Sequence, residues 1–170
     1  MFEIKKAGIA ETELLCKLGA QTFTDAYAAN NTKEDLEAYN KKSFAPEVIL
    51  AELNEINTEY YLCFDGPLAI GYLKLNFDKA CEAFESDQTT ELQRIYVLKE
   101  YYQHKAGMKL MQYAIEICTA RHNKYLWLGV WKENYRALKF YQAWGFETIG
   151  ERSFKVGSKL YEDYYLRKKL

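Results

Sequence analysis

The hydrophobic pattern at the start of the chain predicts one short strand followed by three helices. Residues 2–5 form the strand. Between residues 11 and 27 the apolar positions recur mostly along one side of a helix. Thr32, followed by Asp35, resembles a capping box and predicts a second helix that runs through Asn40. A third helix is expected over residues 46–53, because its first residue is a proline, which suits a first turn.

From residue 60 onward the pattern becomes that of strands. Residues 60–64 and 69–77 are apolar and aromatic runs on either side of the turn signal Asp65-Gly66, so they are predicted to pair as a hairpin. Residues 78–90 are polar and acidic and are predicted to form a loop. A third strand is expected over residues 91–98, which include the run Ile95-Tyr96-Val97.

The loop that follows this third strand is a candidate anion site. After Gly107 the apolar residues recur at helical spacing as far as Cys118, so a polar loop joins a strand to a helix. The first N–H groups of such a helix lack internal partners and can bind a phosphate or diphosphate. Gly107 would let the main chain approach the anion with a positive φ. The same glycine could equally open a helix in any α/β protein.

The end of the chain predicts a strand, a helix and a closing hairpin. Residues 125–131 are almost continuously apolar, as in a strand buried on both faces. A short helix is expected over residues 134–144. The last residues, 148–154 and 161–166, are predicted to pair around Gly157. This order of elements predicts an α/β fold, in which a central mixed β-sheet of about seven strands is flanked by helices.

Composition narrows the class of protein. At 170 residues the chain is expected to form a single domain over residues 1–170. The formal net charge of −1 argues against non-specific nucleic-acid binding, which needs a basic surface. No apolar run approaches membrane-spanning length and residues 1–5 do not resemble a signal peptide, so a cytoplasmic location is expected.

The cysteines and histidines do not indicate a metal site. Two of the four cysteines lie within apolar runs and none shows CxxC spacing, so they are expected to be reduced and mostly buried thiols. The four are Cys16, Cys63, Cys81 and Cys118. His104 and His122 do not belong to a ligand constellation, and no metal is predicted.

Three segments together resemble the GNAT superfamily of N-acetyltransferases. They are Arg94-Ile95-Tyr96-Val97 with the loop to Gly107, the strand Trp127-Leu128-Gly129-Val130-Trp131, and the block from Asn134 to Phe146. The last block has the form N-x-x-A-x-x-F-Y-x-x-x-G-F and is the most specific piece. The order of elements agrees along nearly the whole chain. The Trp-Leu-Gly-Val-Trp strand is similar to that of bacterial spermidine/spermine N-acetyltransferases of the PaiA type.

This resemblance implies acetyl-CoA as the cosubstrate. The residues that it implies for coenzyme A binding are Ile95, Tyr96, Val97, Tyr102, Gln103, His104, Lys105, Ala106, Gly107, Met108, Asn134 and Tyr141. The family's diphosphate loop has the form [QR]-x-x-G-x-[GA], from which this sequence departs. Aligned without gaps, the polar residue falls on Tyr102 and the first glycine on Lys105, which would then take a positive φ. A second register uses Gln103 and Ala106 but misplaces the apolar face of the helix.

The chemistry of acetyl transfer assigns further roles. An amine attacks a thioester only when neutral, yet a free alkylamine has a pKa of roughly 10.4, so a base must take its proton. Glu91, at the start of the central strand, is the candidate base, with a solvated strand-end carboxylate as the alternative. The resemblance implies that the Val97 N–H donates to the developing oxyanion and that Tyr141 protonates the leaving thiolate. It also implies that Asn134 binds the pantetheine arm. The alternative role of Tyr141 is that of an ordinary helix-face aromatic, and the alternative role of Asn134 is that of a helix N-cap.

The acceptor is expected to be a small-molecule primary amine, and the resemblance favours polyamines. Amines favour acidic and aromatic surroundings, and the candidate lining residues are Tyr27, Tyr72, Glu85 and Trp131. Two alternatives are a non-catalytic CoA-binding regulatory protein and an N-acetyltransferase that acts on proteins or peptides. The sequence allows a homodimer without predicting one.

Overall fold

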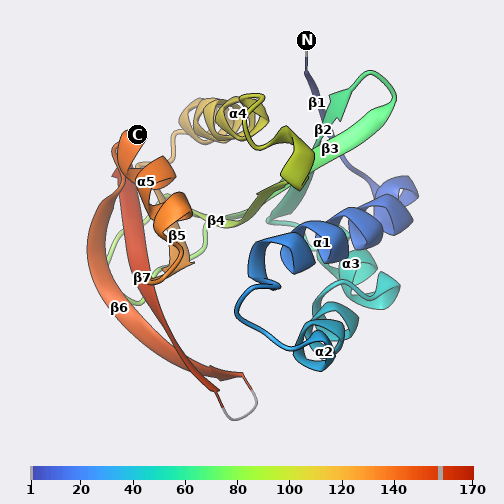
Figure 1. The fold of residues 1–170 in the computed structure, drawn as a ribbon. Helices are drawn as coiled ribbons and strands as arrows, with labels where there is room; N and C mark the ends of the chain where they lie inside the picture. The colour runs from blue at the N-terminus through green and yellow to red at the C-terminus, as the bar shows by residue number, and fades with distance from the viewer. Residues whose placement is uncertain (1, 157–158) are drawn as a thin grey trace. The chain divides into compact units, whose positions relative to one another are not determined.

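A computed structural model describes residues 2–156 and 159–170 of the chain (Figure 1). The described chain divides into two compact units. Unit 1 comprises Met1–Leu75 and Arg94–Ala114, and unit 2 comprises Asn76–Gln93 and Ile115–Leu170. The prediction of a single domain over the whole chain therefore stays a prediction.

Unit 1 contains the first strands and most of the helices. Its elements are β1 (Glu3–Lys6), η1 (Ile9–Glu11), α1 (Thr12–Tyr27), α2 (Lys33–Ser43), α3 (Pro46–Leu53), β2 (Thr58–Asp65) and η2 (Lys99–Tyr101). Three further elements contribute residues to both units: β3 (Leu68–Phe77), β4 (Thr89–Val97) and α4 (Ala106–Ala120). The cap predicted for the second helix is confirmed, because the Thr32 hydroxyl accepts a hydrogen bond from the N–H of Asp35 at 3.1 Å.

Unit 2 contains the remaining elements, β5 (Tyr125–Trp131), α5 (Tyr135–Ala143), β6 (Glu147–Val156) and β7 (Lys159–Lys169). The closing hairpin is longer than the sequence predicts, because the ladder between β6 and β7 continues through polar residues, from Glu147–Arg167 to Val156–Lys159. The predicted turn at Gly157 lies outside the described residues.

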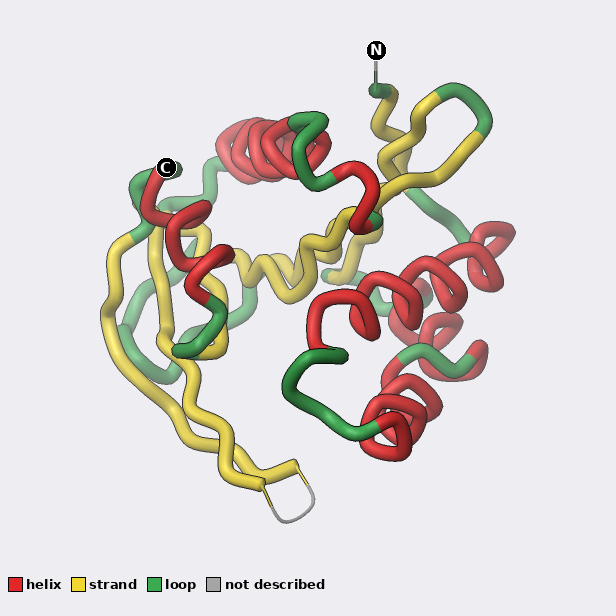
Figure 2. Tube along the Cα trace, in the orientation of Figure 1, coloured by secondary structure: helices red, strands yellow, loops and turns green. Residues whose placement is uncertain are grey.

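The described strands form a seven-stranded sheet in the order β1-β2-β3-β4-β5-β7-β6. The sheet is mixed: β4 and β5 are parallel, whereas β1 pairs antiparallel with β2 and β7 pairs antiparallel with both β5 and β6. Figure 2 shows the strands and helices along the Cα trace. The predicted α/β fold with a mixed sheet of about seven strands and flanking helices is confirmed.

The core of unit 1 packs helices on β2 because this strand is apolar on both faces. Tyr60 and Leu62 belong to the cluster that contains Leu15 of α1 and Ile49 of α3, all 1% exposed. Tyr61 points to the other face, where its ring meets that of Tyr113 on α4 edge to face at 5.3 Å. Full burial of one such aliphatic side chain contributes about 1.5–3 kcal/mol, so both faces of this strand stabilise the unit.

Unit 2 has a smaller core built around Trp127. The indole packs with Cys81 and Tyr165, and its N–H donates to the carbonyl oxygen of Lys79 at 2.9 Å. The polar segment between β3 and β4 therefore folds over one face of β5 and β7. It is a loop, as predicted, although β4 already begins at Thr89.

The four cysteines are free thiols, and Cys63, Cys81 and Cys118 are buried, as the sequence predicts. Burial raises the pKa of Cys63 to about 11 and that of Cys118 to about 12. Such thiols hold their protons and are poor nucleophiles. Within the described residues, none of the helices has the length and apolar character needed to cross a bilayer.

Candidate functional site

The loop from β4 into α4 lies entirely in unit 1. It opens with η2, after which the N–H of His104 donates to the carbonyl oxygen of Tyr101 at 3.1 Å. The side chains of Gln103, His104 and Lys105 are exposed, and that of Tyr102 is partly buried. The loop thus presents polar and basic side chains at its surface immediately before the helix begins.

The backbone of this loop supports the register aligned without gaps. Lys105 has a φ of +62°, as that register predicts for the position of the first glycine. Ala106, which the second register places there, is instead the first residue of α4. The positive φ predicted for Gly107 is wrong, because the helix begins one residue before the glycine. A side chain in the left-handed region costs roughly 1–2 kcal/mol, so the strain of the turn lies at Lys105.

The start of α4 leaves a row of backbone donors unused. The N–H groups of Lys105, Ala106, Gly107 and Met108 find no acceptor in the described part of the chain. The first bond of the helix runs from the N–H of Lys109 to the carbonyl oxygen of Lys105 at 3.0 Å. No acidic side chain lies in the first turn. These donors, the helix dipole and the charge of Lys105 together favour an anion such as a diphosphate.

The end of β4 is held close to β3. The N–H of Leu98 donates to the carbonyl oxygen of Ile70 at 2.8 Å. A Cβ atom at Gly71 would lie 2.7 Å from the carbonyl oxygen of Tyr96, so only glycine permits this approach. Val97 is buried, and Ile95 is partly buried. The strand end that carries the predicted oxyanion donor is therefore fixed by backbone contacts.

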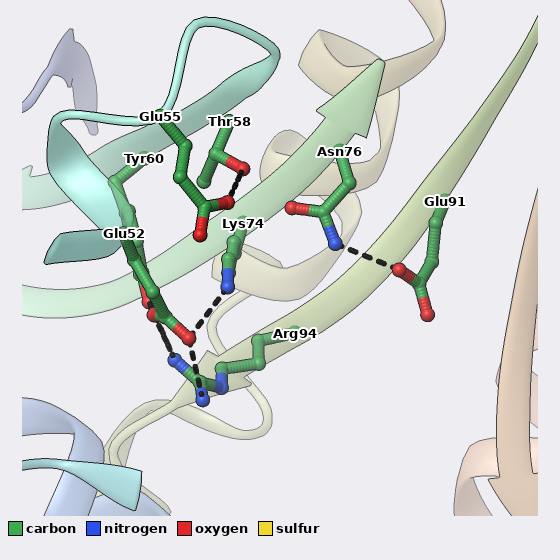
Figure 3. Close-up of polar contacts among 8 residues, drawn as sticks. All are labelled: Glu52, Glu55, Thr58, Tyr60, Lys74, Asn76, Glu91 and Arg94. Carbon is green, nitrogen blue, oxygen red and sulfur yellow. Dashed lines mark hydrogen bonds and ion pairs between the residues drawn. The ribbon is translucent and has the colours of Figure 1, made fainter. Parts of the chain in front are cut away.

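Glu91 lies in unit 2, where β4 meets β5. The two strands pair over only three positions in the described structure, and the last pair is Glu91–Trp127. Glu91 is 8% exposed, and its Oε2 accepts a hydrogen bond of 2.7 Å from Nδ2 of Asn76 (Figure 3). The alternative of a solvated strand-end carboxylate is wrong, because β4 begins at Thr89 and the carboxylate is buried.

Helix α5 carries the two remaining candidates, Asn134 and Tyr141. The Oδ1 atom of Asn134 accepts a hydrogen bond from the N–H of Ala137 at 3.2 Å, which confirms its role as the N-cap. Its Nδ2 group is not needed for that cap, so the capping role is compatible with ligand binding. Tyr141 is 9% exposed, and its ring meets those of Phe140 and Phe146 edge to face at 5.5 and 5.6 Å. The helix therefore fixes the position of the phenol.

The candidate acceptor residues have different surroundings. Tyr72 is 1% exposed, and its ring stacks on those of Tyr60 and Tyr96 at 6.2 and 5.9 Å. This corrects the prediction that Tyr72 lines an acceptor surface, because its position in the middle of β3 places it in the core. Tyr27, at the end of α1, is partly buried beside Phe23 at 4.5 Å.

The other two acceptor candidates belong to unit 2. Glu85 is exposed in the loop between β3 and β4. Trp131, the last residue of β5, is partly buried, and its ring meets that of Tyr161 at 6.1 Å. Among the described residues, no group of three or more His, Cys, Asp or Glu side chains is placed to hold a metal ion.

Sequence reasoning missed two polar residues of β3, Lys74 and Asn76. In unit 1 the ammonium of Lys74 lies 2.7 Å from Oε1 of Glu52, whose Oε2 lies 3.0 Å from Nη1 of Arg94 (Figure 3). In unit 2 Asn76 binds Glu91. Both residues interrupt an otherwise apolar strand at alternate positions, and this period-two pattern was the signal that one face of the strand is polar.

Comparison with known proteins accords with these features. The model of the acetyltransferase (GNAT) family matches residues 21–146. An uncharacterized N-acetyltransferase of Lactobacillus delbrueckii subsp. lactis is 30% identical over 173 residues, which cover 100% of this chain and 99% of the relative. A spermidine N(1)-acetyltransferase of Thermoplasma acidophilum is 26% identical over 152 residues, covering 86% of this chain and 88% of that protein.

The fold agrees with these sequence relationships. The crystal structure of the PaiA N-acetyltransferase from Thermoplasma acidophilum in complex with coenzyme A has a TM-score of 0.81 and 23% identity, and the match covers 100% of this chain and 99% of that one. The match of the family model and the full-length relative establish that this chain belongs to the acetyltransferase (GNAT) family and is an N-acetyltransferase.

Proposed function

We propose that this enzyme transfers the acetyl group of acetyl-CoA to a primary amine of a small molecule, with polyamines as the first class to test. The observation that carries the proposal is the row of unpartnered N–H groups at the start of α4 beside the left-handed turn at Lys105. Backbone donors of this kind bind phosphate groups without sequence-specific side chains.

The residues of the loop fit coenzyme A. The four free N–H groups from Lys105 to Met108 would hold the diphosphate, and the Lys105 ammonium would add a positive charge beside it. Asn134 would bind the amide groups of the pantetheine arm through the part of its side chain that the N-cap does not use. Acetyl-CoA supplies an acetyl group that its thioester activates.

Three groups of the chain would then move or stabilise charge. The Glu91 carboxylate, directly or through a water, takes a proton from the ammonium so that the neutral nitrogen can attack the carbonyl carbon. The N–H of Val97 donates to the carbonyl oxygen as negative charge develops there. The phenol of Tyr141 gives its proton to the sulfur as the carbon–sulfur bond breaks. One carbon–nitrogen bond forms and one carbon–sulfur bond breaks. The ammonium loses two protons in all: one restores the phenol that has protonated the sulfur, and the other passes from Glu91 to the solvent.

The choice of polyamines rests on the name of one relative, the spermidine N(1)-acetyltransferase. Within unit 2, the exposed Glu85 and the partly buried ring of Trp131 are suited to an ammonium through charge pairing and cation–π contact. In unit 1, Tyr27 remains a candidate for the same purpose. The cytoplasmic location, the homodimer and the absence of nucleic-acid binding stay predictions.

The test is to measure release of coenzyme A with saturating acetyl-CoA and a panel of acceptors. The panel contains spermidine, a monoamine of similar length, an amino acid and a short peptide with a free N-terminus. The proposal expects turnover with the small amines and the highest kcat/KM with spermidine. Turnover with the peptide alone would favour a protein acetyltransferase. Binding of acetyl-CoA by calorimetry without turnover of any acceptor would favour a CoA-binding regulatory protein and overturn the proposal.

A further inference from the structure

Glu91 is unusual among the carboxylates of unit 2 because it is buried beside a neutral partner. Its exposed fraction is 8%, and the described residues give it one hydrogen bond, from Asn76, and no ion pair. Asp163, which is also buried, is instead paired with Arg152 at 3.1 Å. Buried carboxylates in proteins are usually paired with a cation, so a neutral partner at Glu91 is better suited to a functional than to a structural carboxylate.

The neighbours of Glu91 enclose it on several sides. Trp127 is its direct partner on β5 and is 4% exposed. Cys81, in the loop over this face, packs with Trp127, and the pKa of its thiol is raised mainly by burial and further by the charges of Glu91 and Glu82. The thiol of Cys81 is thus a protonated neighbour of Glu91 and cannot neutralise its charge.

Asn76 binds only one of the two carboxylate oxygens. Its Nδ2 lies 2.7 Å from Oε2, and Figure 3 shows the other oxygen of Glu91 pointing away from Asn76. A carboxylate can accept about four hydrogen bonds, so most of its capacity is left. An amide fixes the orientation of the side chain without adding a charge, whereas a lysine or arginine here would hold the proton acceptor in a strong ion pair.

We propose that Asn76 is the positioning residue of this enzyme: it holds Oε2 of Glu91 so that the second oxygen is presented to the amine. This inference rests on the proposed function, because it gives Glu91 the role of base. Orientation matters because a displacement of about 1 Å can reduce a rate by about a hundredfold. Asn76 would act through its hydrogen bond to Glu91 and would not need to touch the substrate.

A double-mutant cycle tests whether Asn76 acts through Glu91. The variants are Asn76→Ala, Glu91→Gln and the double variant, with kcat measured at saturating acetyl-CoA and amine. Asn76→Ala should lower kcat by about tenfold and Glu91→Gln by about a hundredfold. The double variant should be no slower than Glu91→Gln, because Asn76 has no base left to position once Glu91 is replaced. Multiplication of the two single losses would overturn the inference.

A second variant distinguishes positioning from a merely structural role. Asn76→Asp is isosteric and places a second carboxylate next to Glu91, so the two would share a proton. The acidic limb of the kcat/KM profile should move to higher pH, while the affinity for acetyl-CoA by calorimetry stays within twofold of wild type. A folded Asn76→Asp enzyme with an unmoved limb would overturn the inference, and this variant also decides the question if Asn76→Ala does not fold.

Gln93→Ala is the matched control, since Gln93 is exposed on the same strand as Glu91. It should keep the wild-type kcat and pH profile. Failure of the proposed function and failure of the role of Asn76 give different results. If wild type turns over no amine, the proposed function fails. If wild type is active, Glu91→Gln is slow and the cycle is multiplicative, only the role of Asn76 fails.

Discussion

Two carboxylates shielded from solvent, Glu52 in unit 1 and Glu91 in unit 2, have opposite surroundings. Glu52 has the ammonium of Lys74 at 2.7 Å, the guanidinium of Arg94 at 3.0 Å and the hydroxyl of Tyr60 as partners. Glu91 has one amide. The first carboxylate is surrounded by charges that oppose its own, and the second is held by a neutral group.

The difference appears in the acid–base properties of the Glu52 region. Burial alone would raise the pKa of Glu52, but Arg94, Lys74 and Tyr60 together hold it below its usual value. Burial lowers the pKa of Lys74, although the hydrogen bond to Glu52 opposes this shift. A carboxylate so strongly stabilised as an anion is a poor proton acceptor. The comparison teaches that the number and charge of partners, rather than burial, separate a structural carboxylate from a candidate base.

The largest expected effect is on stability and concerns Glu52. Glu52→Ala leaves Arg94 and the 3%-exposed Lys74 without their shared anion, and removing one partner of a buried ion pair costs about 3–5 kcal/mol. Urea unfolding monitored by circular dichroism measures this loss. Glu55→Ala is the control, because Glu55 is an exposed carboxylate of the same segment. It accepts one hydrogen bond, from the Thr58 hydroxyl at 2.9 Å, so its loss should cost about 1 kcal/mol. Equal losses of unfolding free energy in the two variants would show that the ion pairs of Glu52 do not stabilise the fold.

The next effect is on turnover and concerns Glu91. Glu91→Gln should lower kcat at pH 7 by about a hundredfold while the unfolding free energy changes little, because the amide can replace the carboxylate in the bond with Asn76. The loss should shrink as the pH approaches the amine pKa of roughly 10.4, where the solvent already supplies neutral amine. The measurement is kcat from pH 7 to 10 for both enzymes. An equal loss across that range would exclude Glu91 as the base.

The order of the elements could be predicted from the sequence, but the partners of Glu52 and Glu91 could not. Hydrophobic period and caps predict the order of elements well, as the Thr32 cap shows. The positive φ of Lys105 also followed, from the alignment of this loop with the diphosphate loop of the family that the sequence resembles. The partners of Glu52 and Glu91 did not, because Lys74 and Asn76 reach them from another element, and which side chains meet depends on a register that one strand's sequence does not contain. Likewise, the sequence of β3 alone did not show that Tyr72 packs in the core of unit 1 and not at an acceptor site.

A smaller effect is expected for the other candidate catalytic residue of unit 2, Tyr141. Tyr141→Phe removes one hydroxyl from a ring whose packing on Phe140 and Phe146 does not need it, so folding should be kept. Loss of the proton donor should lower kcat by about tenfold, or 1.4 kcal/mol in the barrier, with little change in acetyl-CoA affinity. Stopped-flow rates and calorimetry measure the two. Tyr135→Phe, a 69%-exposed tyrosine on the same helix, should behave as wild type.

The smallest effect is a pH dependence of stability that belongs to Glu52. Its folded-state pKa lies below the ordinary value of 4.5, so the ionised carboxylate contributes stability that is fully present above about pH 4.5. That contribution is lost as the pH falls through the lowered folded-state pKa. Wild type should therefore lose unfolding free energy in acid more steeply than Glu52→Gln, which has no proton to gain there. Urea titrations at pH 7, 5, 4 and 3 measure both, and parallel curves would show that the charges around Glu52 do not stabilise its anion.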